Sequence, residues 1–179
     1  YTGKAPFAKY WIHNGLLRPG EGDEKMTRHL RNFVSVQDAL QTYGADAIRL
    51  FILSSHYRSP ITWTEQSVRG AERGAERLRT TLKDYSACPE TNPGDALCRA
   101  ADAARRSFIT FMDNDFDTPR AIAQVFDLAR TINQARDTDA PPQSLSYAQA
   151  VILELTDVLG LTMKGLAAPT ETEPFISLL

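Results

Sequence analysis

The sequence has few cysteines, no long apolar run and no large excess of charge of one sign. Cys88 and Cys98 are the only two cysteines among 179 residues. Two are too few for a disulfide scaffold, so we expect structural thiols in a reducing compartment. The longest apolar stretch, 47–53, is interrupted by Arg49 and is far shorter than the roughly 18 residues of a spanning helix. We therefore predict no membrane segment and, without a secretory pattern, a cytoplasmic location.

Common catalytic and metal-binding motifs are also missing. The sequence contains no G-x-S-x-G, no P-loop and no G-x-G-x-x-G, and its three histidines are scattered. Asp113, Asp115 and Asp117 alternate like the start of a calcium loop, but the glycine and final glutamate of an EF-hand are absent. We predict no metal site in this chain and interpret the aspartates as a helix-capping cluster.

Charge is distributed unevenly along a chain whose formal net charge is −2. Residues 1–63 carry a net charge of +3, whereas residues 64–179 carry −5. Positive potential near one end attracts polyanions such as phosphates, although a plain solvated surface explains so modest an excess equally well.

The first third of the sequence predicts short, mixed elements. Residues 9–17 are rich in aromatic and branched side chains around Asn14-Gly15, which predicts a strand and a turn. Residues 20–29 follow as a loop. Ser35, with Asp38 three residues later, predicts the cap of a short helix that Gly44 ends.

A second short helix is predicted over 46–54, with Ile48, Phe51 and Ile52 facing inward. From Thr64 onward the apolar residues recur every three or four positions, which predicts four longer helices. Thr64 and Thr118 are the expected N-caps of the first and third, and Gly160 the end of the fourth. The four apolar stripes comprise Val68, Ala71, Ala75, Leu78 and Leu82; Leu97, Ala101, Ala104, Phe108 and Phe111; Ile122, Val125, Phe126, Ala129 and Ile132; and Ala148, Val151, Ile152, Leu155 and Leu159.

These elements predict a mainly α protein. A small α/β region with a short β element over residues 1–63 is followed by an antiparallel helical bundle over 64–179, the simplest way to bury four apolar stripes. The loop over residues 20–29, within the first region, carries the most specific candidate for a chemical site. Lys25 and Arg28, with Thr27 between them, can close over a triphosphate on a glycine-flanked loop. A surface loop can also show this spacing by chance.

Six short segments in one order then resemble a known family. KMTRHLRNF (25–33) occupies the place of its KMSKS-LGNF signature, and YGADAIRLFIL (43–53) carries a version of its DALR signature. The others are PFAKYWIHNG (6–15), SSHYRSP (54–60), FMDNDFDTP (111–119) and FDLARTIN (126–133). Together they resemble the cysteinyl-tRNA synthetases, which are class I aminoacyl-tRNA synthetases.

The resemblance implies a stem-contact region followed by a tRNA-docking bundle, within an enzyme that joins cysteine to tRNA(Cys) with ATP and Mg. Lys25, Met26, Thr27 and Arg28 would bind ATP, and Lys25 and Arg28 would act catalytically on its phosphates. For tRNA phosphates we name Arg49, Arg58, Arg69 and Arg73. Equally, Arg69 and Arg73 can pair with Glu65, Glu72 and Glu76 along their own helix.

The family's HIGH motif and its zinc ligands lie upstream of the matched segment, so we expect zinc only there and no catalysis by the 179 residues alone. Three positions depart from the signature: Arg28 replaces lysine, His29 serine and Arg31 glycine. Two alternatives stay open. One is a non-catalytic synthetase-like protein that binds tRNA or another protein, and the other is the related ligase that joins cysteine to an amino sugar in mycothiol synthesis.

Overall fold

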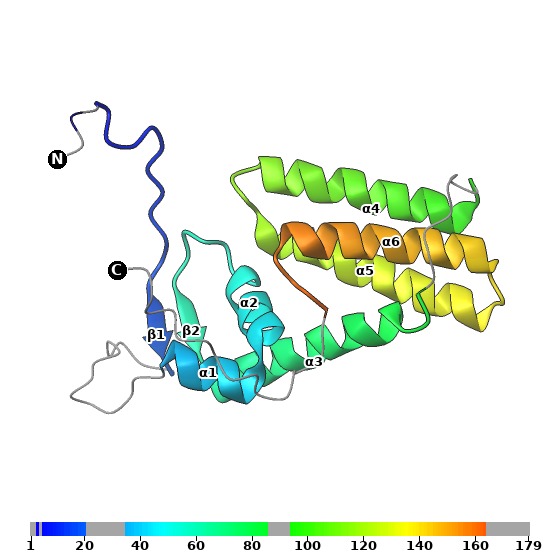
Figure 1. Ribbon diagram of the computed structural model, residues 1–179, viewed down its shortest axis with the longest axis horizontal. Coiled ribbons are helices and arrows are strands. Elements are labelled where there is room, and N and C mark those ends of the chain that lie inside the picture. Colours follow the sequence, from blue (N-terminus) through cyan, green and yellow to red (C-terminus); the bar gives the residue numbers. More distant parts are fainter. Residues whose placement is uncertain (1–2, 4, 21–34, 86–93, 164–179) are drawn as a thin grey trace.

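The computed structural model describes residues 3, 5–20, 35–85 and 94–163 (Figure 1). Within them a short two-stranded sheet borders a set of helices. Its first strand precedes all the described helices, and its second strand lies between the second and the third. In chain order the elements are β1 (Leu17–Pro19), α1 (Val36–Tyr43), α2 (Ala45–Leu53), β2 (Ile61–Trp63), α3 (Glu65–Leu82), α4 (Ala96–Asp113), α5 (Thr118–Asp137) and α6 (Pro142–Val158). The mainly α prediction, with a short β element before the helices, is confirmed.

The two strands pair in parallel, with Leu17 opposite Ile61 and Pro19 opposite Trp63. Just before β1 the chain runs against the turn that leads into β2. The Gly15 amide donates to the Tyr57 carbonyl at 2.7 Å, and a Cβ at Gly15 would lie 2.7 Å from the Pro60 nitrogen and closer still to the Ser59 carbonyl. Only glycine allows this approach of two backbones.

The strand predicted over 9–17 is wrong in position, because the ladder starts at Leu17 and residues 10–16 have no regular structure. A strand needs a neighbour for its backbone groups, and the described partner strand reaches only residues 17–19. The preceding side chains are exposed: Phe7 is 79% exposed, Tyr10 76% and Trp11 69%.

Helices α1 and α2 begin and end much as the sequence predicts. The Ser35 hydroxyl caps α1 by accepting from the Asp38 amide at 3.0 Å, and Gly44 follows α1 with a φ of 79°. Ile48 and Phe51 of α2 are buried, but Ile52 is 53% exposed, which corrects its predicted inward position. Not every residue in the apolar run of α2 is therefore buried.

The four longer helices are confirmed, with one change at a cap. Thr64 caps α3 in a reciprocal arrangement with Ser67. Helix α5 is capped by Asp117 rather than Thr118, because the Asp117 carboxylate accepts from the Arg120 amide and Thr118 is already helical and buried. Gly160, with a φ of 69°, lies just after α6.

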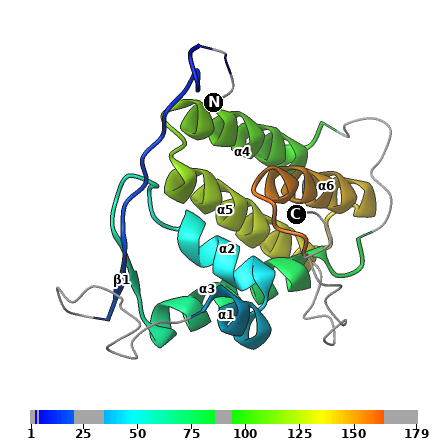
Figure 2. The same cartoon turned by 60° about the vertical axis from the view of Figure 1, so that its left-hand side comes forward.

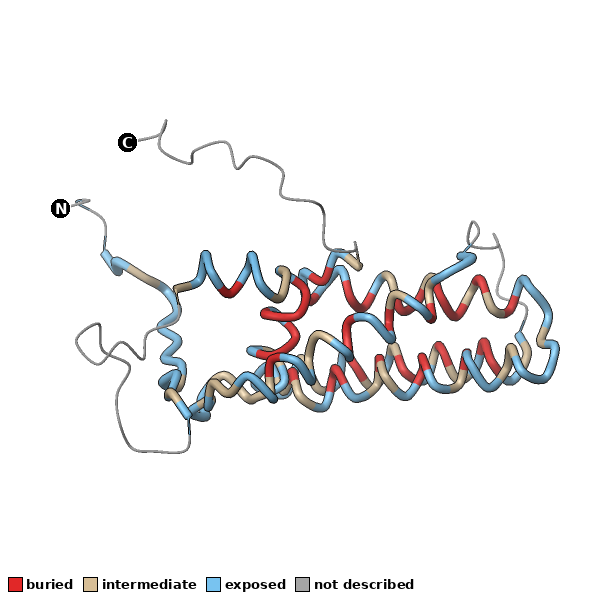
Figure 3. The backbone as a smooth tube through the Cα atoms, turned by 90° about the horizontal axis from the view of Figure 1, so that it is seen from below, coloured by how far each residue is buried: buried red, intermediate tan, exposed pale blue. Residues whose placement is uncertain are grey.

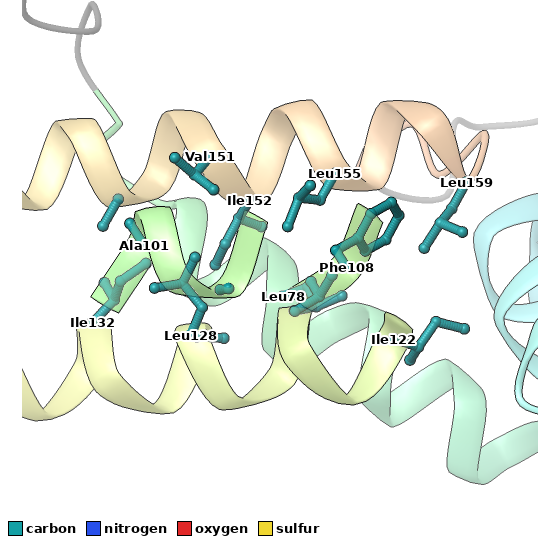
Figure 4. Close-up of a cluster of buried hydrophobic side chains, with 14 of the residues drawn as sticks. Leu78, Ala101, Phe108, Ile122, Leu128, Ile132, Val151, Ile152, Leu155 and Leu159 are labelled. Atoms are coloured by element: carbon teal, nitrogen blue, oxygen red, sulfur yellow. The ribbon is translucent and has the colours of Figure 1, made fainter. Parts of the chain in front are cut away.

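Consecutive helices α4, α5 and α6 run antiparallel and lie side by side on one side of the molecule, and the sheet, α1 and α2 lie on the other (Figures 1 and 2). The buried faces of α4, α5 and α6 turn toward one another (Figure 3). The core that they enclose includes Phe108, Ile132, Val151 and Ile152 (Figure 4). The antiparallel bundle that the apolar stripes predict is present.

Helix α3 contributes to two hydrophobic clusters. Its Val68 packs with Ala39, Ile48 and Phe51, whereas its Ala75 and Leu78 belong to the core of the bundle. Leu50 of α2 also belongs to the bundle core. The division at residue 63 stays a prediction, and the packing across it is continuous.

Polar side chains of the bundle donate hydrogen bonds to the carbonyls at the C-terminal end of α3. Arg136 donates to the carbonyls of Thr81 (2.7 Å) and Lys83 (3.0 Å), and the Gln149 amide donates to the Thr81 carbonyl at 2.9 Å. The last carbonyls of a helix have no partner within it, so these bonds satisfy them and attach α3 to α5 and α6.

Replacement of Ile152 by alanine tests the core. Ile152 is fully buried, so Ile152→Ala should lower the free energy of unfolding by about 2–5 kcal/mol in urea titrations of the 179-residue chain. Val158→Ala, on the same helix at a side chain that is 63% exposed, should change it by less than about 0.5 kcal/mol. Equal effects of the two variants would contradict this core.

Candidate functional site

The predicted phosphate-binding residues Lys25, Met26, Thr27 and Arg28 lie outside the described residues. The structure does describe the elements on either side of them. Gly20, directly after β1, donates its amide to the Trp63 carbonyl at 3.0 Å, and Ser35 caps α1 on the far side. The segment that carries these residues therefore connects a strand of the sheet to the first helix.

The YGADAIRLFIL segment forms the junction between α1 and α2, and its aspartate is buried. Asp46 is 3% exposed and accepts from the Thr162 amide at 2.9 Å. Arg79 of α3 donates to its second oxygen at 3.4 Å. A buried carboxylate needs partners of this kind, so Asp46 joins the start of α2 to α3 and to the chain that leaves α6.

The SSHYRSP segment is joined to the FMDNDFDTP segment through one carboxylate. Arg58 binds Asp115 with two guanidinium nitrogens, at 2.7 and 3.0 Å, and the Tyr57 hydroxyl donates to the same carboxylate at 2.7 Å. His56 lies 3.8 Å from it. Asp115 has a φ of 56°, so the turn between α4 and α5 presents this carboxylate through left-handed backbone.

These contacts favour the ionised carboxylate. Hydrogen bonds from Arg58 and then Tyr57 lower the pKa of Asp115 to about 2, and the bond to Asp115 raises the pKa of Tyr57. The local sequence pattern indicates only a capping role for Asp115. Its bridge to residues 56–58 could not be found from local spacing, because the partners are 57 positions apart along the chain.

The four arginines predicted to bind tRNA differ in how far they are already engaged. Arg58 is bound to Asp115, Arg69 lies 2.7 Å from Glu65, and Arg49 lies 4.0 Å from Asp46. Arg73 is exposed, and within the described ranges no ion pair or hydrogen bond engages its side chain. Their role in binding tRNA stays a prediction.

Arg77 is a candidate that the sequence analysis missed. It is exposed one helical turn after Arg73, and its guanidinium lies 5.2 Å from the centre of the Phe126 ring of α5. The spacing of four residues from Arg69 to Arg73 to Arg77 was visible in the sequence and could have identified it.

Arg77 borders an open groove of about 400 Å³ between the end of α2, β2 and α3. Leu50, Phe51 and Phe126 contribute apolar surface to it, and several hydroxyl side chains line it as well. Its remaining lining residues are Ser54, Ser55, Pro60, Ile61, Thr62, Ser67, Gly70, Ala71 and Gly74.

No group of three or more His, Cys, Asp or Glu side chains in the described part of the chain could hold a metal ion. Cys98 is fully buried at the start of α4, and burial raises the pKa of its thiol, so it fits the structural role predicted for it. Cys88 lies outside the described residues. Among the described helices, none combines the length and the apolar character needed to cross a bilayer.

Two family models match this chain, one over its N-terminal part and one over the bundle. Residues 1–73 match the tRNA synthetases class I (C) catalytic domain, and residues 107–164 match the DALR domain. A cysteine–tRNA ligase of Dehalococcoides mccartyi is 43% identical over the whole chain. This chain is a homologue of the cysteine–tRNA ligases. The resemblance inferred from six short motifs is confirmed.

Other cysteine–tRNA ligases match most of the chain. That of Geobacillus thermodenitrificans is 42% identical over 91% of it, and that of Thioalkalivibrio sulfidiphilus 40% identical over 87%. The chain spans 38%, 36% and 31% of the lengths of the D. mccartyi, G. thermodenitrificans and T. sulfidiphilus ligases. It thus spans about a third of the length of these relatives.

A solved structure shares the arrangement of helices. The agnB2 LeuRS of Agrobacterium radiobacter K84, crystallised as a ternary complex with tRNA and LeuAMS, superposes with a TM-score of 0.67. The match covers 86% of this chain and 22% of that one, at 18% identity. At this identity the likeness establishes the fold.

Replacement of Asp115 by asparagine tests the bridge to residues 56–58. A pKa lowered by folding means that the ionised carboxylate stabilises the fold above the ordinary aspartate pKa, and that this contribution is lost as pH falls toward 2. The melting temperature of Asp115→Asn should therefore lie below that of the unchanged chain at pH 6, and the difference should shrink between pH 4 and pH 2.

Asp113→Asn is the matched control for this bridge, because Asp113 is exposed two residues away and no described residue forms an ion pair with it. Its melting temperature should follow that of the unchanged chain over the same pH range. A constant difference between Asp115→Asn and the unchanged chain from pH 6 to pH 2 would show that the carboxylate charge does not matter.

Proposed function

We propose that this chain is the part of a cysteine–tRNA ligase that carries the phosphate-binding signature loop and the helices that dock tRNA. The observation that carries the proposal is the 43% identity to a cysteine–tRNA ligase along the whole chain. The matches to a class I catalytic domain and to a DALR domain support it, since they fall on the region of the loop and on the bundle respectively.

The proposed reaction has two steps. Cysteine and ATP form cysteinyl-adenylate with release of pyrophosphate, and the cysteinyl group then passes to the 3′ end of tRNA(Cys). Lys25 and Arg28 would stabilise the charge that develops as pyrophosphate leaves, and Thr27 would shape the loop. Arg28 keeps the positive charge of the family's lysine in a planar, two-pronged form, so phosphate contact survives this substitution.

The helical part would position tRNA by contacts to its phosphates. Arg49, Arg69 and Arg73 are the proposed contacts on α2 and α3. Arg58 would serve as a contact only with the donors that its bond to Asp115 leaves free. We place the protein in the cytoplasm, where its ATP and tRNA substrates are found.

Zinc would be held outside these 179 residues. No set of ligands for it occurs in the described ranges, and Cys98 is fully buried beside Asp95 and Ser144. A thiolate-binding metal supplies selection for cysteine, because serine offers no comparable soft donor. The residues described here would position tRNA and connect the loop to the bundle.

Replacement of the two loop cations tests the catalytic part of the proposal. Lys25→Ala and Arg28→Ala in the whole protein should each lower cysteine-dependent exchange of pyrophosphate into ATP by about 10²–10³-fold, because each removes a charge aimed at the leaving group. Arg106→Gln, an exposed arginine of α4, should leave exchange unchanged. Exchange that is insensitive to both loop variants would remove Lys25 and Arg28 from the mechanism.

Charging assays identify the acceptor. The proposal expects cysteine-dependent exchange followed by transfer of cysteine to tRNA(Cys). Exchange without charging, together with transfer of cysteine to an amino sugar, would assign the mycothiol-type ligase instead. Binding of tRNA without exchange would identify a non-catalytic relative. The 179-residue chain alone should charge no tRNA, and detectable charging by it would contradict the assignment of the missing steps to other residues.

A further inference from the structure

An exposed glycine inside α3 has no explanation within the described fold. Gly70 is the sixth of the 18 residues of the helix, and a Cβ built on it would meet no atom within 4 Å. Glycine inside a helix costs about 1 kcal/mol relative to alanine. Gly74, one turn later, differs, because a Cβ there would lie 3.1 Å from Leu50 and 3.2 Å from Phe126. Internal packing accounts for Gly74 but not for Gly70.

The charges around Gly70 are not balanced. Helix α3 contains three glutamates, and each lies near Arg69 or Arg79: Glu65 lies 2.7 Å from Arg69, Glu72 4.0 Å from Arg69 and Glu76 2.9 Å from Arg79. Arg73 and Arg77 have no acidic partner in the described part of the chain. Arg77, seven residues after Gly70, lies on the same helix face as Gly70, and both line one groove. Arg73, three residues after Gly70, lies at the edge of that face and lines the neighbouring hollow with Tyr43 and Glu76.

The groove described above begins at this face. Gly70 and Arg77 both line it, and Thr62 of β2 and Ser55 contribute hydroxyls from its other side. No hydrogen bond within the described ranges engages either hydroxyl. The groove thus offers a bare helix backbone at Gly70, the Arg77 guanidinium over the Phe126 ring and hydroxyl side chains opposite, with Arg73 just outside it. Neither arginine has an acidic partner in the described residues, so together they fit a narrow, polar and anionic chain.

We propose that the sugar-phosphate backbone of tRNA crosses α3 at Gly70, with Arg73 and Arg77 bound to its phosphates. This inference rests on the proposed function, since it takes the tRNA substrate from there. The absence of a side chain at Gly70 lets the RNA approach the helix backbone closely. The contacts are to phosphate and sugar, so they position the RNA rather than read its bases.

The groove could in principle hold RNA or another segment of the same protein, and the charges beside it favour RNA. A protein segment would have to bring two carboxylates to neutralise Arg73 and Arg77, whereas consecutive phosphates of a nucleic acid supply negative charge along the whole groove. Each of the three glutamates of α3 lies within 4.0 Å of Arg69 or Arg79, which offsets part of its negative charge beside the groove.

The test uses the whole protein and a tRNA(Cys) transcript. Gly70→Ala and Gly70→Leu should raise or preserve the melting temperature, because both residues favour the helix more than glycine does and the added Cβ meets no atom within 4 Å. They should nevertheless raise the KM for tRNA, and leucine should do so more than alanine. A purely structural role for Gly70 would instead lower the melting temperature.

Arg73→Gln and Arg77→Gln should each weaken tRNA binding by about tenfold, the effect of losing one hydrogen bond to a charged group. Each should also reduce the slope of log Kd against log salt concentration by about one. Arg106→Gln is the matched control, since it removes an exposed arginine of α4 that has no ion pair in the described residues. It should change neither quantity.

Pyrophosphate exchange needs no tRNA, so it separates the two proposals. Unchanged exchange with a raised KM for tRNA in the Gly70, Arg73 and Arg77 variants supports the proposal that tRNA crosses α3 at Gly70. Unchanged exchange with KM values within twofold of the unchanged protein overturns that proposal and leaves the ligase assignment standing. A lowered melting temperature for Gly70→Leu would show that protein covers this face, which also overturns it. Absence of exchange by the unchanged protein would overturn the ligase assignment itself.

Discussion

The close approach of three helices at Gly74 is the constraint on which the rest of the structure depends. A Cβ at this position would lie 3.1 Å from Leu50 of α2 and 3.2 Å from Phe126 of α5. Because the side chain is absent, α2 and α5 both reach the same turn of α3. The N-terminal half of α3 can then pack on α1 and α2 through Val68, while its C-terminal half enters the bundle through Leu78.

Two aspartates add polar connections to this apolar contact. Asp46 holds the start of α2 to Arg79 of α3 and to Thr162 after α6, and Asp115 holds the turn after α4 to residues 56–58. Each lies in a segment that resembles the cysteinyl-tRNA synthetases. Both join parts of the chain that are remote in sequence, so they fix the sheet region relative to the bundle. This position matters for the proposed function, because the signature loop leaves from the sheet and the proposed RNA-binding helix leads into the bundle.

The proposed tRNA face follows from how the charges of α3 are used. Arg69, Arg73 and Arg77 follow one another at intervals of four residues, yet of these three only Arg69 lies within 4.0 Å of glutamates of the same helix in the described residues. The prediction that Arg69 pairs along its helix agrees with this geometry, whereas the same prediction for Arg73 is wrong. Glu72 is adjacent to Arg73 in sequence, so the two side chains do not face each other, and it lies near Arg69 instead. Glu76 is three residues from both Arg73 and Arg79, and it binds Arg79 at 2.9 Å.

Much of the helical architecture was predictable from the sequence alone. Periodic apolar residues, the Ser35 and Thr64 caps and the glycines at 44 and 160 act within one or two helical turns, so local rules determine where the helices lie. The family could be recognised for the same reason, since its motifs are short and contiguous. Tertiary structure alone decided that residues 10–16 have no strand partner, that Ile52 faces outward, that Asp115 binds Arg58, and that Gly70 is bare while Gly74 is packed. These outcomes depend on which distant segment lies opposite each residue, and that is set by the packing of the whole chain rather than by any local pattern.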